Sequence, residues 1–266
     1  MKQRILWMLM AFALAAPQIG CATGKSPSRA IADTLLPVSQ ENELGKQMSA
    51  EVEKELKLST NAAINSWVDG LGKKVVRAAR DVPKGIQFTF KVVDDPNTVN
   101  AFAMPGGYIY VYTGLLKKAS NEAEILGVLG HEVAHVTQRH IAKRLVAAYG
   151  LSAVAGIALG KNPGLLAELV AGIVSNGYLL KHSRDAERES DKIGIGYTVA
   201  AGYTPMGYVT FFQKLAAEPH PPVLLSSHPN PDERVQNARS VIATYRKSII
   251  DQPDGKAKYD EMIRQL

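Results

Sequence analysis

The sequence contains a single cysteine, Cys21, among 266 residues. No disulfide can form within the chain, so the fold must be held together by its core and by any metal that it binds. The sequence also lacks a long basic block interleaved with aromatic residues, although the formal net charge is +6. Lysines and arginines are mixed with acidic residues along most of the chain, so binding to nucleic acid is not expected.

Apolar runs long enough to cross a bilayer are missing too. The apolar run near the start, Ile5 to Ala16, has twelve residues, whereas a spanning helix needs about 20. Its length and the basic residues before it are typical of a secretory signal peptide. We predict a lipoprotein-type signal peptide over residues 1–20, with cleavage before Cys21, which would then carry the lipid. Cleavage after Ala15, giving a soluble secreted protein, is the alternative.

The remaining chain is expected to contain a tether and one domain. Residues 21–39 include an aperiodic stretch with Ser, Pro and Ala, which favours a tether. Residues 40–266 are long enough to form one large domain with a sizeable core. No internal repeat is visible.

Hydrophobic periodicity predicts a mainly helical α+β domain with a small sheet. Strands are expected over 86–92, 98–104 and 107–113, with a turn around Pro105 to Gly107. Helices are expected over 41–58, 61–80, 121–145, 145–160, 164–180, 183–201, 205–217, 231–247 and 255–265. The Ala- and Gly-rich segment 145–180 could be a plain helical hairpin in the core, a lid over a cleft or a hairpin that contacts a membrane.

Residues 131–135 read HEVAH. On a helix, His131 and His135 lie on one face with Cβ atoms about 5–6 Å apart, so both imidazoles can bind one zinc ion. Glu132 lies about 100° around the helix, where it can reach a water molecule on the metal rather than the metal. This is the HExxH pattern of metallopeptidases, in which the glutamate acts as a base. The apolar neighbours predict a buried helix, in which unpaired histidines would be costly.

A catalytic zinc site needs a third protein ligand from elsewhere in the chain. The best candidate is Glu187, with Asp191 one turn later on the same helical face. Asp191 would accept a hydrogen bond from a ligand imidazole and fix its tautomer. Spacing alone leaves Asp185 and Glu189 open as the third ligand.

Four stretches together resemble the gluzincin family of zinc metallopeptidases that includes the CAAX-type proteases, the HtpX-type heat-shock proteases and periplasmic lipoproteins. These stretches are NAFAMPGGYI at 100–109, GHEVAH at 130–135, SRDAERESD at 183–191 and SHP at 227–229. The chain is most similar to the lipoprotein members, which are BepA- and LoiP-like, but no C-terminal repeat domain is expected. The resemblance implies a zinc metallopeptidase domain over 40–266, with one zinc ion per chain.

The resemblance also implies roles for individual residues. His131, His135 and Glu187 would bind zinc, Glu132 would be the base, and Asp191 would support a ligand. The strand that contains Asn100, Ala101, Phe102 and Ala103 would be a sheet edge that borders the active-site cleft and binds substrate as an added strand.

His228 is ambiguous from the residues alone, because a histidine in a Pro-rich loop is more simply a surface residue. The resemblance implies that His228 faces the zinc, either as a catalytic residue that stabilises the oxyanion or as a ligand that occupies the open position. Arg234 would hold this loop or the transition state. His140, His182 and His220 are expected at the surface or around the site.

These features predict a zinc-dependent endopeptidase of the bacterial cell envelope. The resemblance implies a periplasmic location with a lipid anchor in the outer membrane, and misfolded or misassembled envelope proteins as substrates. The alternative function is a non-proteolytic or latent chaperone or assembly lipoprotein, whose zinc site is closed by His228. The sequence indicates no oligomeric state.

Overall fold

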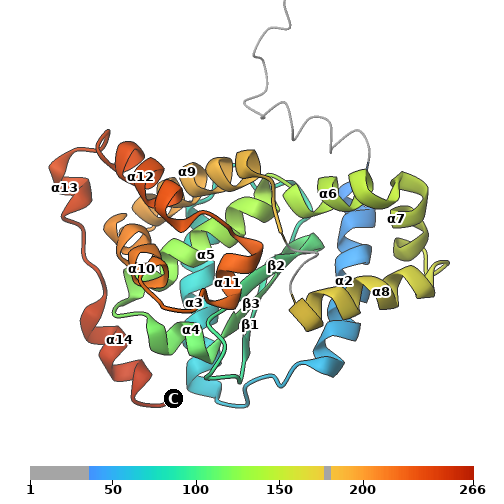
Figure 1. The fold of residues 1–266 in the computed structure, drawn as a ribbon, viewed down its shortest axis with the longest axis horizontal. Helices are drawn as coiled ribbons and strands as arrows, with labels where there is room; N and C mark the ends of the chain where they lie inside the picture. The colour runs from blue at the N-terminus through green and yellow to red at the C-terminus, as the bar shows by residue number, and fades with distance from the viewer. Residues whose placement is uncertain (1–35, 177–180) are drawn as a thin grey trace, which may run out of the picture.

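The computed structural model describes residues 36–176 and 181–266. Helix α5 (Glu122–Thr137) lies at the centre of the fold, and all its residues are buried. Helices α3 (Ala62–Ala78), α9 (Arg184–Ala200) and α10 (Met206–Ala216) pack against it, and so does the sheet (Figure 1). The mainly helical α+β class is confirmed. The predicted signal peptide, Cys21 and most of the predicted tether lie outside the described residues.

The sheet has three strands in the order β1-β3-β2. Strand β1 (Thr89–Val93) is parallel to β3 (Tyr108–Tyr112), whereas β2 (Ala101–Met104) is antiparallel to β3. Strand β2 is therefore a sheet edge, as predicted. A 3-10 turn, Pro105–Gly107, joins β2 to β3. Gly107 has φ +94°, and a Cβ there would lie 2.6 Å from the carbonyl oxygen of Gln87, so this turn requires glycine.

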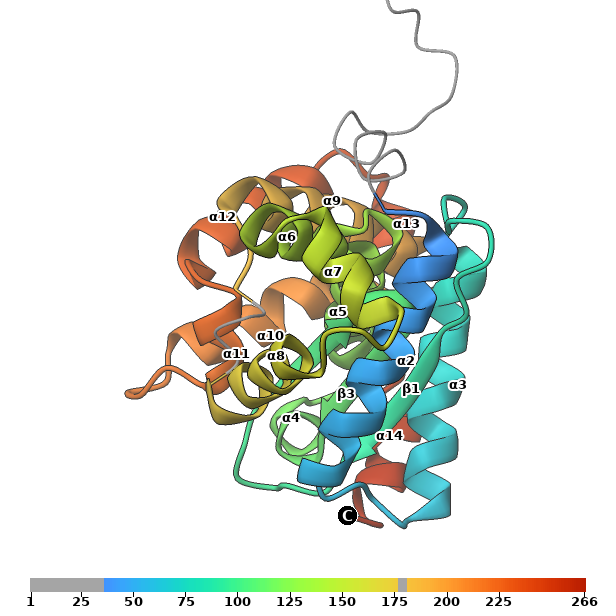
Figure 2. The same cartoon turned by 90° about the vertical axis from the view of Figure 1, so that its right-hand side faces the viewer.

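The sheet is held between helices. Helix α3 packs on β1, and α2 (Val38–Glu55) packs on β2 and on the 3-10 turn (Figure 2). Helix α5 packs on β2 from the interior. The chain therefore places the predicted substrate-binding strand directly beside the helix that carries the HEVAH residues.

The prediction of one continuous helix over 121–145 is wrong, because the chain forms two helices with a break in the C-terminal half of this range. Helix α5 ends at Thr137, and α6 (His140–Tyr149) begins after Arg139, which has φ +57°. The buried guanidinium of Arg139 donates to Glu41 (Nε to Oε2, 2.6 Å) and to the backbone oxygen of Leu36. An isolated charge in the core would be costly, so this pairing with the start of α2 decides where the helix breaks.

The segment predicted as a hairpin forms α7 (Leu151–Ala158) and α8 (Pro163–Asn176), both packed on α2. Gly150, with φ +81°, separates α7 from α6, and these two helices are bent by 116°. No single helix among the described residues is long and apolar enough to cross a membrane, although α6 and α7 meet that test as a bent pair. The inner faces of α7 and α8 are buried, whereas Leu159 between them is 60% exposed.

The remaining described helices are α4 (Thr113–Lys118), α11 (Val223–Ser227), α12 (Pro231–Ile242), α13 (Lys247–Ile250) and α14 (Lys256–Ile263). Periodicity did not predict α4, α11 and α13, because helices of four to six residues are too short to show a 3.6-residue repeat. Helix α5 has a side-chain N-cap, because Oδ1 of Asn121 accepts the backbone N–H of Glu124 at 2.9 Å.

Helices α5 and α9 make their closest approach at two glycines. A Cβ on Gly130 would lie 2.6 Å from the backbone oxygen of Gly194, and a Cβ on Gly194 would lie 2.6 Å from the backbone nitrogen of His131. Because real Cβ atoms do not come this close to backbone, both positions need glycine. This contact sets the distance between the two helices immediately beside the predicted metal ligands.

We expect Gly194→Ala to lower the free energy of unfolding by about 1–3 kcal/mol, because the added methyl group overpacks the contact between α5 and α9. Gly70→Ala in α3 is the matched control, since nothing lies within 4 Å of a Cβ at that position. Urea unfolding followed by circular dichroism measures both variants. The packing argument fails if Gly194→Ala is as stable as the control.

Candidate metal centre

Four buried side chains converge between α5, α9 and the end of α11. Ligand atoms of His131, His135, Glu187 and His228 all lie within 4.8 Å of one another. Nε2 of His131 is 2.9 Å from Nε2 of His135 and 3.1 Å from Nδ1 of His228. Oε1 of Glu187 is 3.4 Å from Nε2 of His135 and 3.1 Å from Nδ1 of His228. Three of the four are the predicted zinc ligands.

The donor atoms fit zinc in kind and in spacing. Four ligands about 2.0–2.1 Å from a tetrahedral zinc ion lie about 3.3 Å from one another, close to the separations of 2.9 to 3.5 Å observed here. Imidazole nitrogen and carboxylate oxygen are also the donors that zinc sites use. The four side chains are at most 2% exposed, so the site excludes bulk water.

The protonation states of the three predicted ligands favour cation binding. Burial, followed by the nearby Arg234, lowers the pKa of His131 to about 4. Burial and His182 hold the pKa of His135 well below its usual value. Both imidazoles are therefore neutral at pH 7, each with one nitrogen lone pair to offer. Burial alone would raise the pKa of Glu187, but His228 and Arg234 keep it well below the usual range, so Glu187 is a carboxylate.

Glu132 lies beside this group without belonging to it. It is 1% exposed, and its Oε1 has no hydrogen-bond partner among the described residues. That oxygen is 3.4 Å from Nε2 of His228. Burial raises the pKa of Glu132 to about 7, a shift that His228 partly offsets. A buried carboxyl group with one oxygen that accepts no hydrogen bond and with a pKa near neutral is suited to transfer a proton.

Asp191 and Arg234 form a buried ion pair behind the metal-facing side chains. Oδ1 of Asp191 is 2.8 Å from Nδ1 of His131 and 2.6 Å from Nη2 of Arg234. Burial would raise the pKa of Asp191, but Arg234 and His131 lower it to about 2. The carboxylate therefore accepts the Nδ1–H of His131, which leaves Nε2 free to face the metal position.

Arg234 connects α12 to both sides of the centre. Its Nη1 lies 3.1 Å from Oε2 of Glu187 and donates to the backbone oxygen of His228 at 3.4 Å. Of the two predicted roles of Arg234, holding the His228 loop agrees with these contacts. The contacts of Arg234 link the backbone position of His228 to the carboxylate of Glu187.

Sequence reasoning missed one contributor to the site. The hydroxyl of Tyr208 in α10 donates to Asp191 and accepts from Arg234. For His140 and His182 the sequence leaves open a position at the surface or around the site. Both are largely buried and lie beside His135.

The predicted substrate-binding residues Asn100, Ala101, Phe102 and Ala103 lie along edge strand β2, but they are at most 6% exposed. Beside the edge, the backbone N–H of Leu224 in α11 donates to the carbonyl oxygen of Val99 at 3.2 Å. The side-chain oxygen of Asn100 is buried with no hydrogen-bond partner among the described residues. The edge is thus beside the centre, and it is covered in this conformation.

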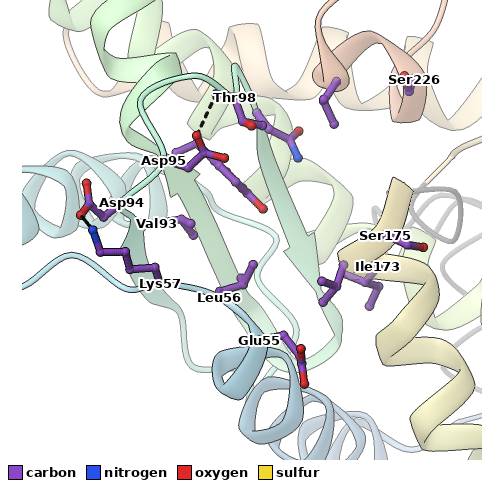
Figure 3. Close-up of a pocket in the computed structure, with 14 residues that line it drawn as sticks. Glu55, Leu56, Lys57, Val93, Asp94, Asp95, Thr98, Ile173, Ser175 and Ser226 are labelled. Atoms are coloured by element: carbon purple, nitrogen blue, oxygen red, sulfur yellow. Dashed lines mark hydrogen bonds and ion pairs between the residues drawn. The ribbon is translucent and has the colours of Figure 1, made fainter.

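A cavity of about 630 Å³ opens at the N-terminal end of β2 (Figure 3). Asn100 and Thr98 line it from the sheet side, Ile173 and Ser175 from α8, and Ser226 from α11. The residues that line this cavity do not include the four metal-facing side chains or Glu132.

Comparison with known proteins also indicates a metallopeptidase. Residues 62–242 match peptidase family M48. A Vibrio cholerae protein named as a beta-barrel assembly-enhancing protease is 30% identical over 258 residues, covering 89% of this chain and 52% of the relative. The beta-barrel assembly-enhancing protease of Escherichia coli is 26% identical over 82% of this chain and 47% of the relative. The metalloprotease YcaL of Escherichia coli is 32% identical over 65% of this chain and 70% of the relative. The chain spans about half the length of the first two.

We expect Asp191→Asn to weaken zinc binding by about 10- to 100-fold, because Arg234 loses one of its two carboxylate partners and His131 loses its anionic hydrogen-bond acceptor. Competition against a chromophoric chelator measures the affinity. Asp185→Asn in the same helix is the control, since its side chain is 91% exposed and pairs only with Arg188 in the described contacts. Equal affinities of the two variants would contradict the proposed support of His131.

Proposed function

The chain belongs to peptidase family M48, and from this premise we propose that it is a zinc-dependent endopeptidase with Glu132 as its base. The single observation that carries the proposal is the buried group of His131, His135, Glu187 and His228 with Glu132 beside it, one oxygen of which accepts no hydrogen bond among the described residues. A structural zinc site needs no carboxyl group beside its ligands. Zinc as the bound metal is consistent with the family and with the imidazole and carboxylate donor atoms.

The metal and the protein side chains would each carry out part of the peptide-bond hydrolysis. Zinc bound by His131, His135 and Glu187 would polarise the scissile carbonyl and lower the pKa of a water molecule. Glu132 would take the proton from the attacking water and return it to the leaving amine, because its pKa of about 7 suits both steps at neutral pH. Asp191 and Arg234 keep His131 and Glu187 in place.

His228 supports a second proposal, that the conformation seen here is latent. Its Nδ1 lies 3.1 Å from Nε2 of His131 and 3.1 Å from Oε1 of Glu187, so it could occupy the position that a catalytic zinc site leaves open for water or substrate. The cover over β2 supports the same interpretation, because substrate cannot pair with an edge that is buried. A chain that remained closed would act as a non-proteolytic chaperone or assembly factor, which is the alternative function.

We propose unfolded or misassembled polypeptides as substrates. An edge strand recognises main chain and is indifferent to most side chains, and the buried, unpaired oxygen of Asn100 offers an acceptor for a substrate N–H. The names of the relatives point to proteins of β-barrel assembly. For this chain we propose a periplasmic location, with Cys21 as a lipid anchor to the outer membrane. Secretion as a soluble protein is the alternative.

We expect Glu132→Gln to bind zinc with wild-type affinity and to lose casein cleavage by about 10²- to 10⁴-fold, because only the proton transfer is removed. Metal analysis and a cleavage assay on the same preparation measure the two properties. Glu168→Gln, on the exposed side of α8, is the control. Cleavage by Glu132→Gln at the rate of the control would contradict the proposed role of Glu132 as the base.

We expect His228→Ala to increase casein cleavage several-fold, because the substitution frees the fourth position while three ligands remain. The initial rate at saturating zinc, compared with that of the wild type, measures the effect. A lower rate would show instead that His228 acts on the transition state, and an unchanged rate would remove it from the site.

A further inference from the structure

His135 must hold its ring in one tautomer to bind a metal. Its Nε2 faces His131 and Glu187 at 2.9 and 3.4 Å, so this nitrogen carries the lone pair and Nδ1 carries the proton. For His131, the equivalent Nδ1–H donates to the carboxylate of Asp191. His135 is 0% exposed, so its Nδ1–H also needs an acceptor within the protein.

The group within reach is a third histidine. Nδ1 of His140, the first residue of α6, lies 3.1 Å from Nδ1 of His135. The other nitrogen of His140, Nε2, lies 3.1 Å from Oε2 of Glu189 in α9. Only one arrangement of protons satisfies both contacts. His135 donates from Nδ1 to Nδ1 of His140, and His140 donates from Nε2 to the carboxylate of Glu189.

The surroundings of His140 agree with this arrangement. The ring is 6% exposed, and the hydroxyl oxygen of Ser190 lies 3.2 Å from the same Nδ1, which suits a nitrogen that accepts. The opposite tautomer of His140 would place two N–H groups against each other and leave Glu189 facing a bare nitrogen. The break between α5 and α6 at Arg139 is what turns His140 back toward His135.

We propose that His140 and Glu189 are positioning residues, which fix the tautomer and orientation of His135 through a two-step hydrogen-bonded relay. The inference rests on the proposed metal centre. His131 has a carboxylate in direct contact, whereas His135, one turn later, reaches its carboxylate through an intervening imidazole. Spacing alone leaves Glu189 open as the third zinc ligand. In the structure Glu189 is the outer end of the relay, and its side chain is 28% exposed at the protein surface.

The test compares zinc affinities of the full chain carrying His140→Phe, His140→Gln or Glu189→Gln. Phenylalanine fills the space of the ring without hydrogen bonds, so we expect an affinity about 10- to 100-fold weaker than that of the wild type. Glutamine can accept through its carbonyl oxygen and donate through its amide, so His140→Gln should recover most of the loss. Glu189→Gln keeps an acceptor but loses the charge, and we expect an intermediate loss.

His220→Phe is the control, because it replaces an exposed histidine outside the metal-facing group. This variant should bind zinc as the wild type does. Urea unfolding of the metal-free variants checks that His140→Phe and His140→Gln are equally folded. The absorption spectrum of the cobalt-substituted proteins reports ligand geometry independently of cleavage.

Three results would overturn the relay. These are wild-type zinc affinity in His140→Phe, equal losses in folded His140→Gln and His140→Phe, or an Nε2–H tautomer of His135 in the ¹⁵N NMR spectrum of the metal-free protein. A wild-type chain that binds zinc and cleaves nothing would refute the proposed endopeptidase but leave the relay measurable through affinity. A wild-type chain that binds no zinc would overturn both the relay and the metal centre.

Discussion

The contact between α5 and α9 is the constraint on which the site depends. Helix α5 supplies His131, Glu132 and His135, and α9 supplies Glu187 and Asp191. The short side chains of a zinc site can meet only if the two backbones come close together. Gly130 and Gly194 permit this, because any larger residue at either position would hold the helices apart. The metal-facing geometry is therefore a consequence of packing between two helices.

This close packing brings ionisable groups into the core, where they must compensate one another. Glu187, Asp191 and Arg234 are all buried, and each would be expensive alone. Their contacts form a network in which the guanidinium of Arg234 reaches both carboxylates. Glu132 is buried beside this network, and its Oε1 accepts no hydrogen bond among the described residues. Burial raises the pKa of Glu132 toward the range in which a base is effective, although His228 partly offsets the shift.

The structure combines a complete site with restricted access. Four donors face one point, and edge strand β2 is covered, while α11 places His228 among the donors and binds the backbone of Val99 at the end of that strand. One short helix thus touches both the metal-facing group and the approach to the predicted substrate edge. Movement of α11 would change both together, which offers a physical route from a latent to an active protein.

The sequence alone determined the helical positions of His131, Glu132 and His135 and the presence of a strand over 98–104, because these features depend on spacing and local preference. It could not decide between Glu187 and its acidic neighbours, since all lie in one charged run, and only the crossing of α5 and α9 selects one carboxylate. The break at Arg139 also escaped local rules, because its cause is an ion pair with Glu41 nearly a hundred residues earlier. The roles of His140, Tyr208 and the buried position of His228 follow from contacts between distant segments, which no periodicity in the chain records.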